Sequence, residues 1–159
     1  MVGDAVERNL FKMTMPGRGL IQQFLRQAVD AKCTHAVVEL TSEGAIQHRH
    51  AALELDALVF TNLAPEHIER HGSLEAYADA KLSLARAVAS SPKRPRIIVA
   101  NADDAYGAQF LAVEADIKAP FSLADAEPYT ADDKSVRFLW KGVLFSVPLP
   151  GLFNLKNCL

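Results

Sequence analysis

The sequence predicts one α/β domain, with a mainly parallel sheet flanked by helices and a small antiparallel hairpin near the C-terminus. Three short apolar runs, at 35–40, 57–61 and 96–100, are separated by segments of helical character. This alternation is typical of parallel strands that are covered on both faces. The 159 residues leave room for one domain, and the 50% hydrophobic and 23% charged composition is that of a globular protein.

The other elements follow from local patterns. Residues 19–31 place apolar side chains at helical spacing, which predicts an amphipathic helix. Three further elements are predicted: a helix over 73–89, a hairpin formed by 136–140 and 143–147 around Lys141 and Gly142, and the first turns of a helix over 152–159.

Charge and composition exclude several classes of protein. Seventeen basic and 19 acidic residues leave a net charge of -2, which offers no electrostatic attraction for nucleic acid or an anionic membrane. No apolar run approaches the roughly 20 residues of a membrane span, and no signal-peptide pattern is present. Cys33 and Cys158 form neither a disulfide framework nor a metal-binding spacing. We therefore expect a cytoplasmic protein with no nucleic acid and no membrane as partner.

Polar side chains follow each predicted strand. They are Glu39, Thr41, Ser42 and Glu43 after the first strand, Thr61 and Asn62 after the second, and Asn101, Asp103 and Asp104 after the third. The carboxyl ends of parallel strands meet at one edge of a sheet, where open α/β proteins bind their ligands. The sequence therefore predicts a ligand site at this edge.

Lys81 stands in the apolar stripe of the helix predicted over 73–89. It shares a helix face with Leu74, Tyr77, Ala85 and Val88. One interpretation is a lysine that covers apolar surface and extends its charge into water. The other is a desolvated amine with a lowered pKa, which acts as a nucleophile or captures carbon dioxide as a carbamate.

Two histidines lie four residues apart in the segment 65–71. The order is His-x-Glu-x-His and not the His-Glu-x-x-His of zinc peptidases, which argues against zinc hydrolysis. His67 and Glu66 are expected instead to bind a harder ion such as magnesium, together with Glu39 from the neighbouring strand. His71 is expected to cap or pack.

The segment 47–50 concentrates hydrogen-bond donors. Gln47 and Arg49 are suited to holding a carboxylate or a phosphate. A solvated helix face is the alternative.

Six motifs follow one another along the chain. They lie at 38–44, 47–49, 60–72, 75–81, 101–104 and 150–157. In this order they resemble the central domain of the Mur ligase family, most closely its MurE branch, from about Thr14 to the end of the chain.

The resemblance implies a role for each matching residue. Glu39 would hold the Mg²⁺ that bridges the phosphates of ATP, His67 would bind a second Mg²⁺, and Lys81 would act as a carbamate beside them. Four residues would hold a UDP-muramoyl dipeptide: Thr14, Thr41, Gln47 and Arg49. Asn101 would lie near the adenine of the nucleotide, and Asn154 and Asn157 belong to the last motif of the central domain.

The implied activity is that of an ATP-dependent amide ligase of peptidoglycan synthesis. ATP would phosphorylate the carboxylate of UDP-N-acetylmuramoyl-L-alanyl-D-glutamate, and the amine of an amino acid would attack the acyl phosphate. Two alternatives remain open: another amide ligase of the superfamily, acting on a different muramyl step, folate or cyanophycin, and a non-catalytic relic or assembly module. The chain departs from the family pattern at Met15, Glu43 and Glu66, where threonine, histidine and aspartate are common.

The G-x-x-x-x-G-K-[ST] phosphate loop and the C-terminal domain of the family are absent from the sequence. We therefore expect a fragment of a ligase. Residues 1–159 would form a partial central domain, and its partner would be the remainder of its own ligase chain. We expect this polypeptide alone to hydrolyse no ATP.

Overall fold

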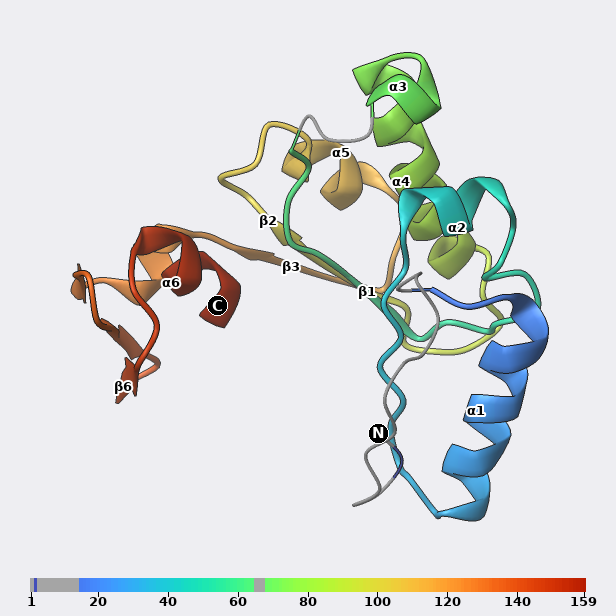
Figure 1. Cartoon of the computed structure of the whole chain (residues 1–159), viewed down its shortest axis with the longest axis horizontal. Helices are drawn as coiled ribbons and strands as arrows, with labels where there is room; N and C mark the ends of the chain where they lie inside the picture. Colours follow the sequence, from blue (N-terminus) through green and yellow to red (C-terminus); the bar gives the residue numbers. More distant parts are fainter. Residues whose placement is uncertain (1, 3–14, 65–67) are drawn as a thin grey trace. The chain divides into compact units, whose positions relative to one another are not determined.

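A computed structural model of the chain describes residues 2, 15–64 and 68–159 (Figure 1). The chain forms two compact units. Unit 1 comprises Met1–Glu54 and His67–Leu84, and unit 2 comprises Leu55–Glu66 and Ala85–Leu159.

Unit 1 is helical in the part that the structure describes. It contains α1 (Arg18–Asp30), α2 (Ser42–Ile46), α3 (Ile68–His71) and most of α4 (Leu74–Ala89). The helices predicted over 19–31 and 73–89 are confirmed as α1 and α4.

The strand predicted over 35–40 is wrong. These residues lie outside every helix and strand, and Val37 is 94% exposed. A strand is stable only where a neighbour pairs with its backbone groups, and none of the strands among residues 15–64 and 68–159 pairs with this segment. Glu39 therefore does not lie at the end of a strand.

Unit 2 contains the predicted parallel sheet. The strands β1 (Ala57–Phe60), β2 (Ile97–Asn101) and β3 (Ile117–Phe121) pair in the order β1-β2-β3, all parallel. The predicted fold class is confirmed, with β3 in place of the strand expected over 35–40. β3 was not predicted because this edge strand contains Lys118 and Pro120 and lacks an apolar run.

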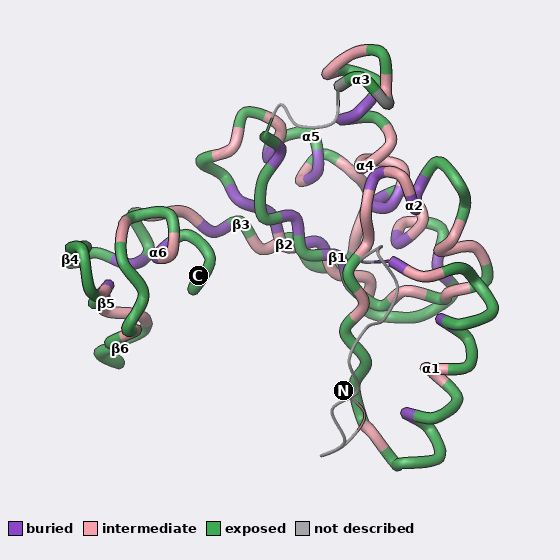
Figure 2. Tube along the Cα trace, viewed as in Figure 1, coloured by how far each residue is buried: buried purple, intermediate pink, exposed green. Residues whose placement is uncertain are grey.

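The core of the parallel sheet lies on β2 and on the helix α5 (Gly107–Ala112). Ile98 and Ala100 on β2 are fully buried, as the tube in Figure 2 shows for this strand. Phe60 of β1 stacks on Phe110 of α5 with 3.9 Å between ring centroids. These contacts hold α5 against the sheet.

The C-terminal part of unit 2 forms a separate antiparallel sheet. The strands are β4 (Tyr129–Ala131), β5 (Val136–Trp140) and β6 (Val143–Val147), preceded by the 3₁₀ turn η1 (Leu123–Ala126) and followed by α6 (Leu152–Cys158). A small core of Ala126, Val136, Phe138 and Leu155 joins them.

The predicted hairpin is confirmed as β5 and β6. Lys141 and Gly142 both have positive φ angles, 49° and 81°. Two such residues form the turn whose twist matches that of antiparallel strands. The predicted C-terminal helix is confirmed as α6, whereas β4 was not predicted.

Among the helices that the structure describes, none combines the length and the apolar character that crossing a membrane requires.

Candidate functional site

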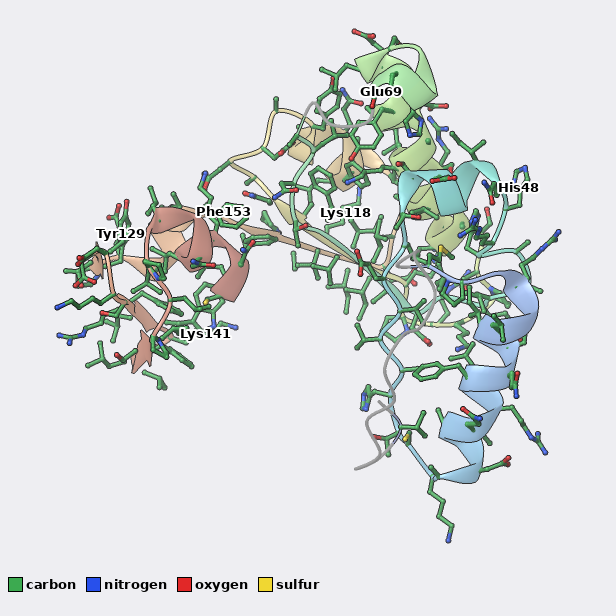
Figure 3. The ribbon with its side chains drawn as sticks, viewed as in Figure 1. His48, Glu69, Lys118, Tyr129, Lys141 and Phe153 are labelled. Carbon is green, nitrogen blue, oxygen red and sulfur yellow. The ribbon has the colours of Figure 1, made fainter. Side chains whose placement is uncertain are left out.

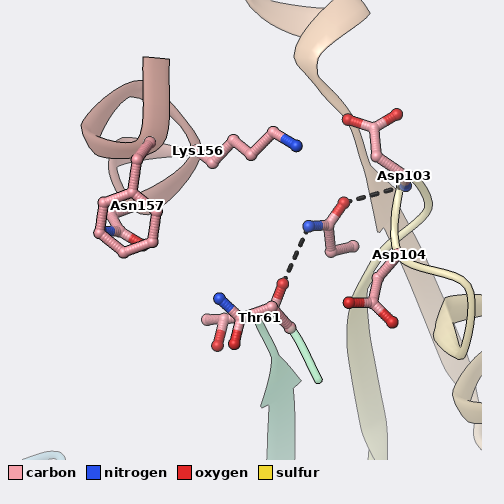
Figure 4. A pocket seen from close by; sticks show the side chains of 8 residues that line it. Thr61, Asp103, Asp104, Lys156 and Asn157 are labelled. Carbon is pink, nitrogen blue, oxygen red and sulfur yellow. Dashed lines mark hydrogen bonds between the residues drawn. The ribbon is translucent and has the colours of Figure 1, made fainter. Parts of the chain in front are cut away.

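A polar cavity of about 180 Å³ lies beyond the carboxyl ends of β1 and β2 in unit 2 (Figure 4). It is lined by Thr61, Asn62, Asn101, Asp103, Asp104, Phe153, Lys156 and Asn157. Pockets for drug-sized ligands measure roughly 300–1,000 Å³, so this cavity suits a single ring system.

Asn101, the last residue of β2, holds the two strand ends together. Its side chain donates from Nδ2 to the carbonyl of Thr61 and accepts from the N–H of Asp103, both at 2.9 Å. The residue is only 6% exposed. Its amide is therefore part of the cavity wall and fixes the chain after β1.

Asp103 and Asp104 accept hydrogen bonds from backbone N–H groups, and each has one donor on another segment. Asp104 accepts from Leu63 at Oδ2 and from Tyr106 at Oδ1, each at 2.9 Å. Asp103 accepts at Oδ2 from Leu123, the first residue of η1, at 2.8 Å. We call Asn101, Asp103 and Asp104 the strand-end clamp, because they tie the segments that follow β1, β2 and β3.

Three residues of α6 line the other side of the cavity. Phe153, Lys156 and Asn157 share one helix face. Phe153, which Figure 3 labels on α6, is 66% exposed. Asn154 does not line the cavity; its Nδ2 donates to the carbonyl of Pro150 at 2.7 Å. Phe153 and Lys156 were not predicted as site residues, although the helical spacing of Phe153 from Asn157 is a signal that points to them.

In unit 1, Thr41 is the N-cap of α2. Its Oγ1 accepts from the N–H of Gly44 at 3.0 Å. A hydroxyl that accepts a capping bond still has its own O–H to donate. The cap therefore leaves Thr41 chemically able to bind a ligand.

Gln47 and Arg49 lie just after α2 and are bonded to each other. Arg49 donates from Nε and Nη2 to Oε1 of Gln47 at 2.9 and 2.6 Å, and from Nη1 to the carbonyl of Met15. Gln47 in turn donates to Glu43 at 3.3 Å. These bonds hold the guanidinium in one place.

His48 and His50 lie in the same segment as Gln47 and Arg49, with 6.3 Å between the two histidine ring centroids. Burial lowers the pKa of His50, and the charge of His48 lowers it further. Both effects favour a neutral His50.

Lys81 is half-buried on α4, with Nζ 5.1 Å from the ring centroid of Tyr77. The Tyr77 ring lies 4.9 Å from the ring of His71, whose Nε2 is 3.1 Å from Oγ of Ser42. His71 packs as predicted, and its buried Nδ1 has no hydrogen-bond partner among the residues that the structure describes.

The predicted metal ligands are only partly covered by the structure. Glu39 is exposed on the segment before α2, and Lys81 lies in the same unit. Two predicted site residues, Thr14 and His67, lie outside the described residues. Within the described residues, no three His, Cys, Asp or Glu side chains are grouped as a metal site. The metal-binding roles of Glu39, His67 and Lys81 stay predictions.

A parallel sheet whose strand ends open onto a polar cavity defines the class of α/β proteins that bind a ligand at this edge. The profile of the Mur ligase middle domain family matches residues 8–159. The chain belongs to this family.

Its relatives include enzymes named UDP-N-acetylmuramoyl-L-alanyl-D-glutamate--2,6-diaminopimelate ligase. The one from Ectopseudomonas mendocina is 38% identical over 160 residues, which cover 93% of this chain and 32% of the relative. The one from Gloeobacter violaceus is 34% identical over 148 residues, covering 87% and 29%. The chain thus spans about 30% of the length of these curated relatives.

Two solved structures are similar in fold. A structure titled as the 2,6-diaminopimelate ligase superposes with a TM-score of 0.68 at 27% identity, covering 87% of this chain and 30% of the other. MurF from Acinetobacter baumannii superposes with a TM-score of 0.54 at 15% identity, covering 66% and 24%, and shares the fold.

Proposed function

We propose that the chain is part of an ATP-dependent ligase that adds an amino acid to UDP-N-acetylmuramoyl-L-alanyl-D-glutamate in peptidoglycan synthesis. The observation that carries this proposal is the family match over residues 8–159, together with relatives named as ligases of this substrate. The domain assignment is a partial central domain over residues 1–159. The proposal includes a cytoplasmic location.

In the proposed reaction, ATP phosphorylates the side-chain carboxylate of the dipeptide, and the amine of the amino acid displaces phosphate from the acyl phosphate. Phosphoryl transfer depends mainly on positioning and on neutralisation of charge. Magnesium, when bound, neutralises charge on the phosphate oxygens. Glu39, His67 and Lys81 would hold it in this chain.

Lys81 would take part as a carbamate. The amine nitrogen forms a bond to the carbon of carbon dioxide and one amine proton passes to solvent, which leaves a carboxylate-like group. Oxygen ligands of this kind, with a few protein groups and water, suit Mg²⁺. The half-buried position of Lys81 on α4 supports this role, since the amine is partly shielded from water.

The cavity at the strand ends would hold the adenine ring of ATP. Its volume of about 180 Å³ and its lining by Asn101 and Asn157 fit one polar ring. Asn154, in the first turn of α6, would support the cavity from beside it, because its bond to the carbonyl of Pro150 ties α6 to the residues before it.

The experiment is a calorimetric titration of the purified chain with UDP-N-acetylmuramoyl-L-alanyl-D-glutamate. Thr14, Thr41, Gln47 and Arg49 are the proposed binding residues. We expect Arg49→Ala to weaken binding about tenfold or more, because a charged hydrogen bond to a carboxylate contributes roughly 1.5–3 kcal/mol.

The matched control is Arg26→Ala on α1, which removes an exposed arginine paired with Asp30 at 3.4 Å. It is expected to leave affinity unchanged. Tighter binding of tetrahydrofolate than of the muramoyl dipeptide would favour another ligase of the superfamily. Equal affinity of the Arg49→Ala and parent chains would contradict the proposed substrate site.

A further inference from the structure

His71, the last residue of α3, contacts two other helices of unit 1. Its Nε2 lies within hydrogen-bond distance, 3.1 Å, of Oγ of Ser42, the first residue of α2. Its ring lies 4.9 Å from the ring of Tyr77 on α4, with 48° between the ring planes. His71 therefore joins α2 to α4, through a hydrogen bond on one side and a ring contact on the other.

Both partners of His71 are buried. Ser42 is 6% exposed and Tyr77 is 5% exposed. A hydrogen bond that is shielded from water is stronger than an exposed one, and a closely packed ring has little freedom to turn. The imidazole is thus held between two side chains that are themselves fixed.

The second ring nitrogen of His71 argues that packing alone does not account for this residue. Nδ1 is buried and has no hydrogen-bond partner in the part of the chain that the structure describes. A buried polar atom without a partner lowers stability, and an apolar side chain of similar size would avoid this cost. The imidazole at position 71 is therefore explained by the bond between Nε2 and Ser42.

The short helix α2 carries proposed substrate residues at both of its ends. Thr41 is its N-cap, Gln47 is its C-cap, and Arg49 follows two residues later. A helix of five residues has little stability of its own and takes its position from its contacts. The bond between Ser42 and His71 therefore helps to fix all three of these residues.

The connection to α4 brings in Lys81, whose Nζ lies 5.1 Å from the ring centroid of Tyr77. In the proposed reaction, the carboxylate of the dipeptide must meet a phosphate held near this lysine. We propose that His71 is a positioning residue of the substrate site, which holds α2 against α4 through Ser42 and Tyr77. The inference rests on the proposed function, because the muramoyl dipeptide is the ligand that α2 would hold.

The test is a calorimetric titration of the full chain with UDP-N-acetylmuramoyl-L-alanyl-D-glutamate. His71→Ala is expected to weaken binding about three- to tenfold, the range that corresponds to one hydrogen bond. Ser42→Ala removes the same bond from its other end and is expected to weaken binding by a similar factor. The double variant is expected to bind no more weakly than either single variant, because all three lack the same bond.

His71→Gln distinguishes positioning from packing. The side-chain amide of glutamine can donate an N–H to Ser42 in place of Nε2 but lacks the ring, so this variant is expected to recover most of the lost affinity. In the Ser42→Ala background, the same substitution is expected to recover none of it.

His35→Ala is the matched control. His35 pairs with a hydroxyl in the same unit, since its Nδ1 lies 2.9 Å from Oγ1 of Thr34, but this pair is exposed and joins neighbouring residues. The control is expected to leave the affinity unchanged. Thermal unfolding establishes that every variant is folded.

The outcomes separate the two proposals. A parent chain that does not bind the dipeptide overturns the proposed substrate site, and the role of His71 with it. A parent chain that binds, with its affinity intact in folded His71→Ala, overturns the role of His71 alone. Additive losses in the double variant, or a His71→Gln variant as weak as His71→Ala, also overturn that role, because Ser42 and His71 would then not act through their shared bond.

Discussion

Asp116 and Arg96 form a two-point ion pair beside the parallel sheet. Arg96 donates from Nη2 to Oδ1 at 2.9 Å and from Nε to Oδ2 at 3.1 Å, and its backbone N–H donates to Oδ2 at 2.7 Å. The hydrogen bonds from Arg96 are the main cause that lowers the pKa of Asp116 far below its ordinary value of 3.8. The pair joins the residues that precede β2 and β3.

This pair predicts an acid-dependent loss of stability. Because the folded-state pKa of Asp116 is lowered, its contribution to the free energy of unfolding is fully present above the ordinary pKa of about 4 and is lost as pH falls below it. Asp116→Asn is therefore expected to be less stable than the parent at neutral pH, with a difference that narrows below about pH 4. Urea unfolding across this range measures it.

The control variant is Asp30→Asn, which changes another aspartate that pairs with an arginine. Asp30 pairs with Arg26 at 3.4 Å, and both side chains are more than 60% exposed. Exposed pairs contribute little, so this variant is expected to follow the parent at every pH. A constant difference between Asp116→Asn and the parent down to low pH would contradict the role of the ion pair.

At the scale of the element, two glycines in helices are expected to respond oppositely to the same substitution. Gly107 begins α5, and a Cβ there would overlap the backbone carbonyl of Asn101. Gly19 lies in α1 with nothing near the position of its Cβ. Gly107→Ala is expected to destabilise the protein by about 1–3 kcal/mol, and Gly19→Ala to stabilise it by about 0.5–1 kcal/mol.

Chemical denaturation of both variants measures these changes. Opposite changes in the free energy of unfolding would show that close packing outweighs helix propensity at Gly107, because helix propensity alone would stabilise both variants. Stabilisation by Gly107→Ala would show that α5 does not approach the end of β2 as closely as the structure has it.

Elements governed by local chemistry were predictable from the sequence. The helices α1 and α4 follow from the spacing of their apolar residues, and the hairpin follows from Lys141 and Gly142 at its turn. Strand formation depends on a partner that local sequence does not reveal. The apolar segment 35–40 pairs with no strand in the part of the chain that the structure describes, whereas β3, with its lysine and proline, pairs with β2.

For the candidate site, the identity of several residues was predictable from the sequence, whereas their contacts were not. Asn62, Asn101, Asp103 and Asp104 were predicted for the sheet edge because they follow strands that do form. The hydrogen bonds that join the segments after β1 and β2 were not predictable, because these bonds depend on the register of the two strands. The contribution of α6 to the cavity depends on tertiary packing as well.

At the scale of the whole molecule, unit 2 presents apolar surface on one edge of its antiparallel sheet. Within the described chain, β6 pairs with β5 and with no further strand. Val143, Leu144 and Phe145 are 55, 72 and 40% exposed. Natural edge strands commonly carry a lysine or proline that prevents pairing with another chain, and β6 carries neither.

We therefore expect the chain to self-associate through β6 at high concentration, and Leu144→Lys to reduce this association. The side chain is exposed, so the free energy of unfolding is expected to change by no more than about 0.5 kcal/mol.

Thr130→Lys on β4, the opposite edge of the same sheet, is the matched control, because it raises the net charge by the same amount at another exposed edge position. Sedimentation velocity measures the result. If both lysine variants reduce association equally, the cause is net charge. If Leu144→Lys alone reduces it, the unprotected apolar edge of β6 is what brings copies of the chain together.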